Sequence, residues 1–131
     1  MIDEFRNYVL KATSGYLVGM GIYPNIAGYT HLLSTIYIAA KRGLRGLSVC
    51  ELYSEAGRTS GKSGAAVERA IRNAINKCVA EGRLHVLNGY FGHEIFSEKF
   101  PPRSGELIFL LADKVRADYT ELKGTDIPDE E

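Results

Sequence analysis

Residues 63–82 read SGAAVERAIRNAINKCVAEG, and the spacing of the apolar residues in this stretch decides the fold class. Apolar side chains recur every three or four residues, so in an α-helix they would form one continuous stripe. The stripe comprises Val67, Ala70, Ile71, Ala74, Ile75, Cys78 and Val79, and the opposite side carries Glu68, Arg69, Arg72, Asn73 and Asn76. The spacing predicts an amphipathic helix from about Ser63 to Glu81, closed by Gly82.

A second, shorter helix is predicted immediately before this one. Ser48 and Glu51 have the spacing of a capping box, so we expect a helix to begin there and to continue through about Ala56. The segment 57–61 is small, polar and typical of a turn. A capped helix, a tight glycine-bearing connection and a second helix with an exposed Arg/Asn face form the pattern of a helix-turn-helix.

The rest of the chain also favours helices. No proline occurs between Asn25 and Phe100, and no alternating pattern is long enough to predict a sheet. Further helical patterns cover residues 2–20, residues from about 26 to 40, a short element at 84–88, and a last helix capped by Ser104 with Leu107, Ile108, Leu111 and Val115 inward. We therefore expect an all-α fold, a compact domain of about six helices, and a disordered tail beyond Leu122.

The charge distribution favours a polyanionic partner. The protein has 131 residues and a formal net charge of zero. The segment 41–83 nevertheless carries nine basic and four acidic residues, a net charge of +5, and the remainder carries −5. Phosphate contacts depend on local charge and not on net charge, so a basic middle is suited to nucleic acid. A set of solvated helix faces is the alternative interpretation of this pattern.

The sequence predicts a cytoplasmic protein without a membrane segment. No apolar stretch approaches the length of a membrane helix, and the N-terminus is acidic and charged where a signal peptide would be basic. In a reducing compartment we expect Cys50 and Cys78 to be thiols, with a disulfide between them as the less favoured alternative.

Two apparent motifs do not predict catalysis or metal binding. Residues 57–63 resemble a phosphate-binding P-loop, but they are one residue short and follow a helical pattern where a buried strand is required. The three histidines, His31, His85 and His93, lack zinc-ligand spacing and are expected to be partly exposed packing residues. We identify no nucleophile with a matched base, and we expect no enzyme activity, no cofactor and no metal.

The residue types on the outer side of the 63–81 helix match the chemistry of DNA bases. Arg69 and Arg72 lie one turn apart and could each form a forked pair with guanine, Asn73 suits adenine, and Glu68 could accept from cytosine. Contacts to DNA phosphates are expected from Arg58, Lys62, Ser63 and Lys77. The alternative is an ordinary exposed helix face, on which Glu68 and Arg72 form an i,i+4 ion pair.

The stretch VERAIRNAI, residues 67–75, resembles the C-terminal effector domain of stage zero sporulation protein A, a regulator of sporulation. Tyr53 and Gly82 on either side of it also match. Further similarity lies at IAGY (residues 26–29), at Phe91-Gly92 and at ADKVR (residues 112–116). The resemblance covers roughly residues 14–119, which leaves 1–13 as an N-terminal helical extension and 120–131 as an acidic, disordered tail.

The resemblance implies a six-helix domain with a helix-turn-helix that binds promoter DNA and regulates transcription. Glu68, Arg69, Arg72 and Asn73 match positions of the family's DNA-reading helix. The family binds short promoter boxes, often in tandem, so pairing of two copies on DNA is expected. It also implies a surface for the sigma subunit of RNA polymerase within residues 82–95, with Gly82, Phe91 and Ile95 at matching positions.

Two departures from the family are visible. A serine and an arginine precede the valine in the family, whereas Ala65 and Ala66 do so here. The loss of a long donor is expected to weaken contact at one or two base pairs, by about 1 to 3 kcal/mol for a lost bidentate pair. The chain begins at Met1 with too few residues for a receiver module, so we expect no phosphorylation-driven dimerisation within it.

Two functions remain open from the sequence. The first is a transcription regulator that binds duplex DNA in a sequence-specific manner. The second is a protein-interaction module that retains the fold and uses the Tyr90-Phe91 region or the acidic tail against a partner.

Overall fold

A computed structural model describes residues 3–43 and 48–124 and places six α-helices in them. The helices are α1 (Glu4–Gly19), α2 (Ala27–Arg42), α3 (Val49–Ser60), α4 (Gly64–Ala80), α5 (Leu84–Phe91) and α6 (Ser104–Lys123). No strand occurs in these two ranges, and the all-α prediction is confirmed. None of the six helices is long and apolar enough to cross a membrane.

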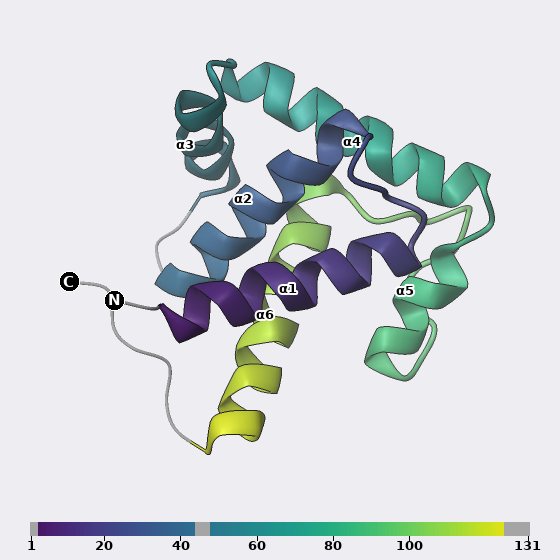
Figure 1. Ribbon diagram of the computed structural model, residues 1–131. Coiled ribbons are helices and arrows are strands. Elements are labelled where there is room, and N and C mark those ends of the chain that lie inside the picture. Colours follow the sequence, from purple (N-terminus) through teal and green to yellow (C-terminus); the bar gives the residue numbers. More distant parts are fainter. Residues whose placement is uncertain (1–2, 44–47, 125–131) are drawn as a thin grey trace.

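Helix α2 is the centre of the domain. It packs against α1, α3, α4 and α6, while α5 lies beside the end of α1 on the far side (Figure 1). The core contains large, fully buried side chains from all six helices and from the α1–α2 connection: Val9, Leu17, Met20, Ile22, Leu32, Ile36, Leu52, Ile71, Leu87, Leu107, Ile108 and Leu111. Because α4 contributes to this core along one side, its axis is fixed relative to the rest of the domain.

The approach of α2 to α4 is close because Gly28 lies at the crossing. A Cβ atom at this position would be 2.5 Å from the carbonyl oxygen of Ala70 and 2.8 Å from the Cβ of Ala74. Small residues on both helices thus allow the two backbones to come together, which presses the inner side of α4 against the central helix.

Two helices, α3 and α5, end later than the sequence predicts. Helix α3 extends beyond Ala56 to Ser60, so that Gly57 is helical. Helix α5 continues beyond Asn88 to Phe91, because the hydroxyl of Tyr90 donates to the carbonyl oxygen of Tyr16, 2.8 Å away on α1. That contact joins residues far apart in the sequence, so local turn preferences could not predict it.

The predicted domain boundaries fall inside helices. Helix α1 runs without a break through the boundary between residues 13 and 14, and its Phe5 and Val9 are buried in the core. Helix α6 continues to Lys123, which corrects the expectation that disorder begins at residue 120. The apolar side of its first turns is buried in the core, and this packing stabilises the rest of the helix. The remainder of the predicted tail, residues 125–131, lies outside the described residues.

Candidate nucleic-acid interface

A three-residue turn, Gly61–Ser63, joins α3 to α4. Gly61 adopts a left-handed conformation with φ of 72°, and the backbone N–H of Lys62 donates to the carbonyl oxygen of Gly57 over 2.8 Å. Ser63 then caps α4, because its side-chain oxygen accepts from the N–H of Ala66 over 3.1 Å. These bonds hold the two helices in a helix-turn-helix arrangement.

The turn is tight enough to require glycine at position 57. A Cβ atom there would lie 2.3 Å from the carbonyl oxygen of Lys62 and 3.2 Å from its carbonyl carbon. The sequence prediction treated Gly57 as part of the turn, whereas the structure places it in the last part of α3, underneath the turn. Its function is therefore close backbone approach, not a change of chain direction.

The inner side of α4 is anchored as the apolar spacing predicted. The buried residues of this helix are Val67, Ile71, Ala74, Ile75 and Cys78. Burial raises the pKa of the Cys78 thiol to about 11, so the thiol is neutral and acts as a small core residue. Both cysteines are free, and Cys50 is exposed on α3. A helix held along this entire side presents its other side in a fixed orientation.

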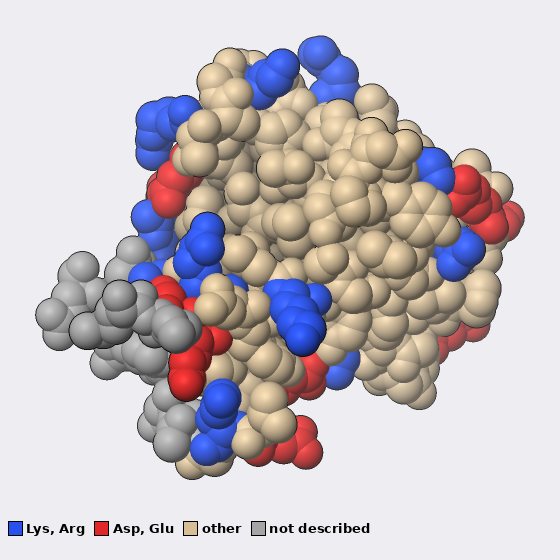
Figure 2. Space-filling model, in the orientation of Figure 1, with Lys and Arg blue, Asp and Glu red and all other residues tan. Residues whose placement is uncertain are grey.

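The outward side of α4, which we call the exposed face, comprises Ala65, Arg69, Arg72, Asn73 and Asn76. Three of the four predicted base-contact residues, Arg69, Arg72 and Asn73, are exposed there, and the Arg72 side chain retains 55% of its accessible surface. Figure 2 shows lysine and arginine side chains along the edge formed by α3 and the start of α4. The face therefore combines long donors with a rigid backbone.

Glu68 occupies the edge of this face and differs from the other three residues. Its side chain is 30% exposed, and both carboxylate oxygens have partners. One oxygen accepts from the hydroxyl of Ser104 on α6 over 3.1 Å, and the other forms an ion pair with Arg72 over 3.3 Å. The predicted i,i+4 pair is therefore present, together with a contact to α6 that the sequence pattern did not indicate.

The residues predicted to contact phosphate divide into two groups. Arg58, Lys62 and Ser63 are exposed at or beside the turn, where the first amide groups of α4 also lie. Lys77 differs from them: its ammonium is 2.6 Å from Glu81 and 3.3 Å from the carbonyl oxygen of Gly21. The bond to Gly21 joins Lys77 to the α1–α2 connection, and its contact with phosphate stays a prediction.

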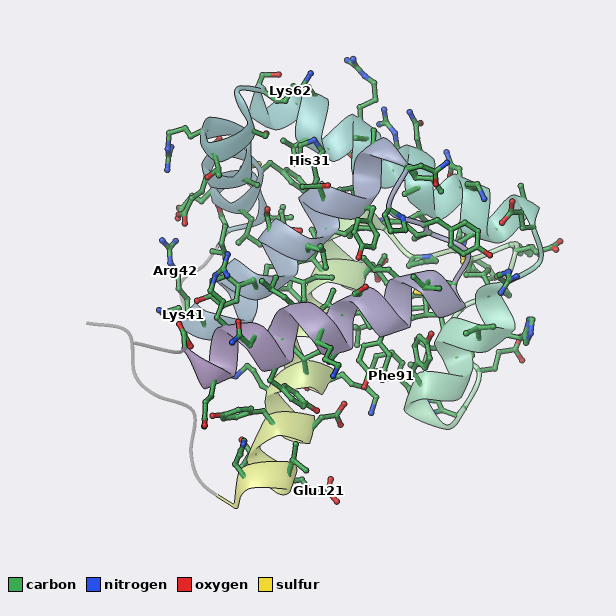
Figure 3. The ribbon with its side chains drawn as sticks, in the orientation of Figure 1. His31, Lys41, Arg42, Lys62, Phe91 and Glu121 are labelled. Carbon is green, nitrogen blue, oxygen red and sulfur yellow. The ribbon has the colours of Figure 1, made fainter. Side chains whose placement is uncertain are left out.

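His31 lies on α2 below the turn, with Lys62 above it (Figure 3). It is 9% exposed, so the prediction of a partly exposed histidine is wrong at this position. Burial, and secondarily the positive charge of Lys62, lowers the pKa of His31 below its usual 6.5. The neutral imidazole is thus the form that the folded domain accommodates.

This lowered pKa gives a prediction about stability. The unfolded chain binds a proton at His31 more readily than the folded one, so the free energy of unfolding should fall as the pH drops below 6.5 and level off below the folded-state pKa. Urea denaturation at about pH 7.5 and about pH 5 should show a smaller loss in His31→Gln than in the wild type. An identical loss in both proteins would contradict the assignment of the pH effect to His31.

The positions predicted for a sigma-subunit surface lie around α5. Gly82 is exposed and lines a shallow depression together with His85, Asn88 and Glu98. Ile95 is half-buried and lines a neighbouring groove beside α4, and Phe91 packs partly against the core. The three residues border the same helix and loop, and their role stays a prediction.

A groove beside the exposed face was not predicted from the sequence. It runs between α4 and the loop before α6, and its lining includes Arg72, Lys99, Phe100 and Arg103. Phe100 is 68% exposed. A loop without periodicity carries no signal of which helix it will meet, so the sequence does not indicate this groove.

The apparent P-loop does not have the required surroundings. Residues 57–60 are the end of α3, so a helix precedes the lysine and serine where a P-loop needs a strand. Among residues 3–43 and 48–124, no three His, Cys, Asp or Glu side chains gather in a way that could hold a metal ion.

Residues 13–115 match the family model described as Sporulation initiation factor Spo0A C terminal. The match extends from the second half of α1 into α6 and includes the whole helix-turn-helix. The family is the DNA-binding domain of a sporulation regulator. The chain therefore belongs to the family of Spo0A C-terminal, DNA-binding effector domains.

Proposed function

We propose that this domain regulates transcription by placing α4 in the major groove of a specific duplex DNA sequence. The observation that carries the proposal is the exposed pair Arg69 and Arg72 on a helix whose other side is anchored in the core. A guanidinium can form two parallel hydrogen bonds with the O6 and N7 atoms of guanine, and Asn73 can pair in the same way with adenine. Glu68 keeps free lone pairs and could accept from a cytosine at the edge of the site.

The contacts that hold the helix in the groove are proposed to come from the turn. Lys62 and Arg58 supply positive charge, while Ser63 and the first amides of α4 supply donors to phosphate oxygens. Such contacts set the register of the helix on the duplex and carry no sequence information themselves. Ala65 is also exposed on α4. Its side chain is too short to reach a base edge in the major groove, so we propose that the base pair opposite it is not contacted.

Partners other than DNA are also part of the proposal. Gly82, Phe91 and Ile95 border the surface that we assign to the sigma subunit of RNA polymerase. Two copies are proposed to bind side by side when promoter boxes occur in tandem. We assign residues 14–119 to the effector domain, and we propose that its role is regulatory and not catalytic. We propose the cytoplasm as its site of action, because promoter DNA is found there.

Fluorescence anisotropy with duplex DNA across a salt series tests the proposal. If about three or four phosphates are neutralised, the logarithm of the association constant should fall with the logarithm of salt concentration with a slope of about −3. A duplex selected from a random pool should bind more tightly than an unrelated duplex of equal length. Weak binding with no preference between the two duplexes would contradict the proposal.

That negative outcome would favour the second candidate, a protein-interaction module. Of the surfaces suggested for it, Tyr90 is half-buried and bonded to the backbone of Tyr16. The acidic tail lies mainly in residues 125–131, outside the described ranges. The groove with exposed Phe100 would then be the first surface to examine.

A further inference from the structure

The first residue of α6 is connected to the exposed face of α4. Ser104 is 7% exposed, and its hydroxyl donates to one carboxylate oxygen of Glu68 over 3.1 Å. Ser104 also lies beside the phenol of Tyr53, a buried residue of α3. Ser104 was predicted to be the helix cap, but the cap position is occupied by Arg103, and the serine hydroxyl donates to Glu68 on α4 instead.

Glu68 in turn contacts Arg72. Its second carboxylate oxygen lies 3.3 Å from a terminal nitrogen of the Arg72 guanidinium. Side-chain exposure increases from Glu68, at 30%, to Arg72, at 55%. The three residues thus form a path from the buried start of α6 to the solvent-facing side of α4.

The contact to Ser104 fixes the position of the Glu68 carboxylate in its ion pair with Arg72. An i,i+4 pair between two exposed side chains is weak, because both side chains must give up rotamer freedom to form it. Here one partner is already held by a buried hydroxyl, so Arg72 meets a carboxylate with a fixed position. Arginine has five N–H donors, and the pair with Glu68 leaves enough of them for a forked contact with guanine.

Arg69 provides an internal comparison. It is exposed one turn earlier on the same face, and no carboxylate within salt-bridge distance of it occurs in residues 3–43 and 48–124. Of the two arginines that we assign to base contacts, only Arg72 is therefore held through Glu68 by Ser104.

We propose that Ser104 is a positioning residue for DNA recognition, which acts through Glu68 to orient the guanidinium of Arg72 toward its base pair. The inference rests on the proposed function, since it concerns how one of the base contacts is held. It assigns to the start of α6, a helix outside the helix-turn-helix, a role in the sequence specificity of α4.

The test measures discrimination separately at the base pairs read by the two arginines. Selection from a random duplex pool with wild type, Arg69→Ala and Arg72→Ala first identifies which base pair each arginine reads. Anisotropy then compares the selected duplex with duplexes changed at one of these pairs. Ser104→Ala should reduce discrimination at the Arg72 pair by about three- to tenfold, which is part of the loss expected for a complete bidentate contact. It should leave discrimination at the Arg69 pair and the salt dependence unchanged.

Two controls separate positioning from a general structural effect. In the Arg72→Ala background, Ser104→Ala should have no further effect on discrimination at the base pair that Arg72 reads, because the side chain it positions there is gone. Ser104→Cys has nearly the same size but only a weak donor, so it should show the same loss of discrimination at the Arg72 pair. It replaces Ser104→Ala in the test if the alanine variant does not fold.

The outcomes are distinguishable. A wild type without sequence preference would refute the proposed function itself. A wild type with clear preference, together with a Ser104→Ala variant that discriminates equally well at every pair, would refute only the positioning role. An equal loss at the Arg69 and Arg72 pairs would also overturn it, because that pattern indicates a general displacement of α4.

Discussion

Gly57→Ala should lower the free energy of unfolding by about 3 kcal/mol, at the upper end of what overpacking costs. The added methyl group would lie 2.3 Å from the carbonyl oxygen of Lys62, a backbone atom that cannot rotate away as a side chain can. The α3–α4 turn would have to open, which would also break the 2.8 Å bond between Lys62 and Gly57. Urea denaturation followed by far-UV circular dichroism measures the change.

Gly15→Ala is the matched control for this variant. Gly15 also lies within a helix, α1, but a Cβ atom there would have no neighbour within 4 Å. Since alanine is the better helix former, this variant should keep or raise the stability by about 0.5 to 1 kcal/mol. If the two variants had the same stability, the close approach at Gly57 would not be a feature of the folded protein.

Arg69→Ala should weaken binding to the selected duplex by about 10- to 100-fold, the value of one lost bidentate contact to guanine. Arg72→Ala should have an effect of similar size. Both side chains are exposed, so neither variant should change the thermal stability beyond a few tenths of a kcal/mol. Anisotropy with selected and unrelated duplexes measures the effect, and the loss should be larger for the selected one.

Lys11→Ala is the control for charge. Lys11 is exposed on α1, outside the helix-turn-helix, and its removal changes the net charge by the same amount. Binding should remain close to that of the wild type. If Lys11→Ala weakened binding as much as Arg69→Ala did, the domain would respond to overall charge, and a specific reading helix would be the wrong description.

Much of the fold follows from local sequence signals. The apolar stripe of α4 and the serine cap of α3 were predicted, because helix periodicity and capping depend on residues three or four positions apart. The errors at helix ends have a different origin. Gly57 has the local properties of a turn residue, and only the close approach of Lys62 explains why it belongs in a helix.

The candidate interface was predictable in outline but not in its connections. Exposed and buried sides of α4 follow from spacing, so Arg69, Arg72 and Asn73 could be identified. The bonds of Lys77 to Gly21 and of Glu68 to Ser104 could not be predicted, because these partners are 56 and 36 residues away in the sequence. Such contacts depend on how the helices pack, and no local pattern encodes them.

An NMR titration of the isotopically labelled protein with the selected duplex tests the central claim most directly. Backbone and arginine side-chain signals report which residues change environment when DNA binds. We predict that the largest shifts occur at the α3–α4 turn and along the exposed face of α4, including the guanidinium groups of Arg69 and Arg72. Shifts confined to α5 and the loop that follows it, with α4 unchanged, would contradict the claim that this helix reads DNA.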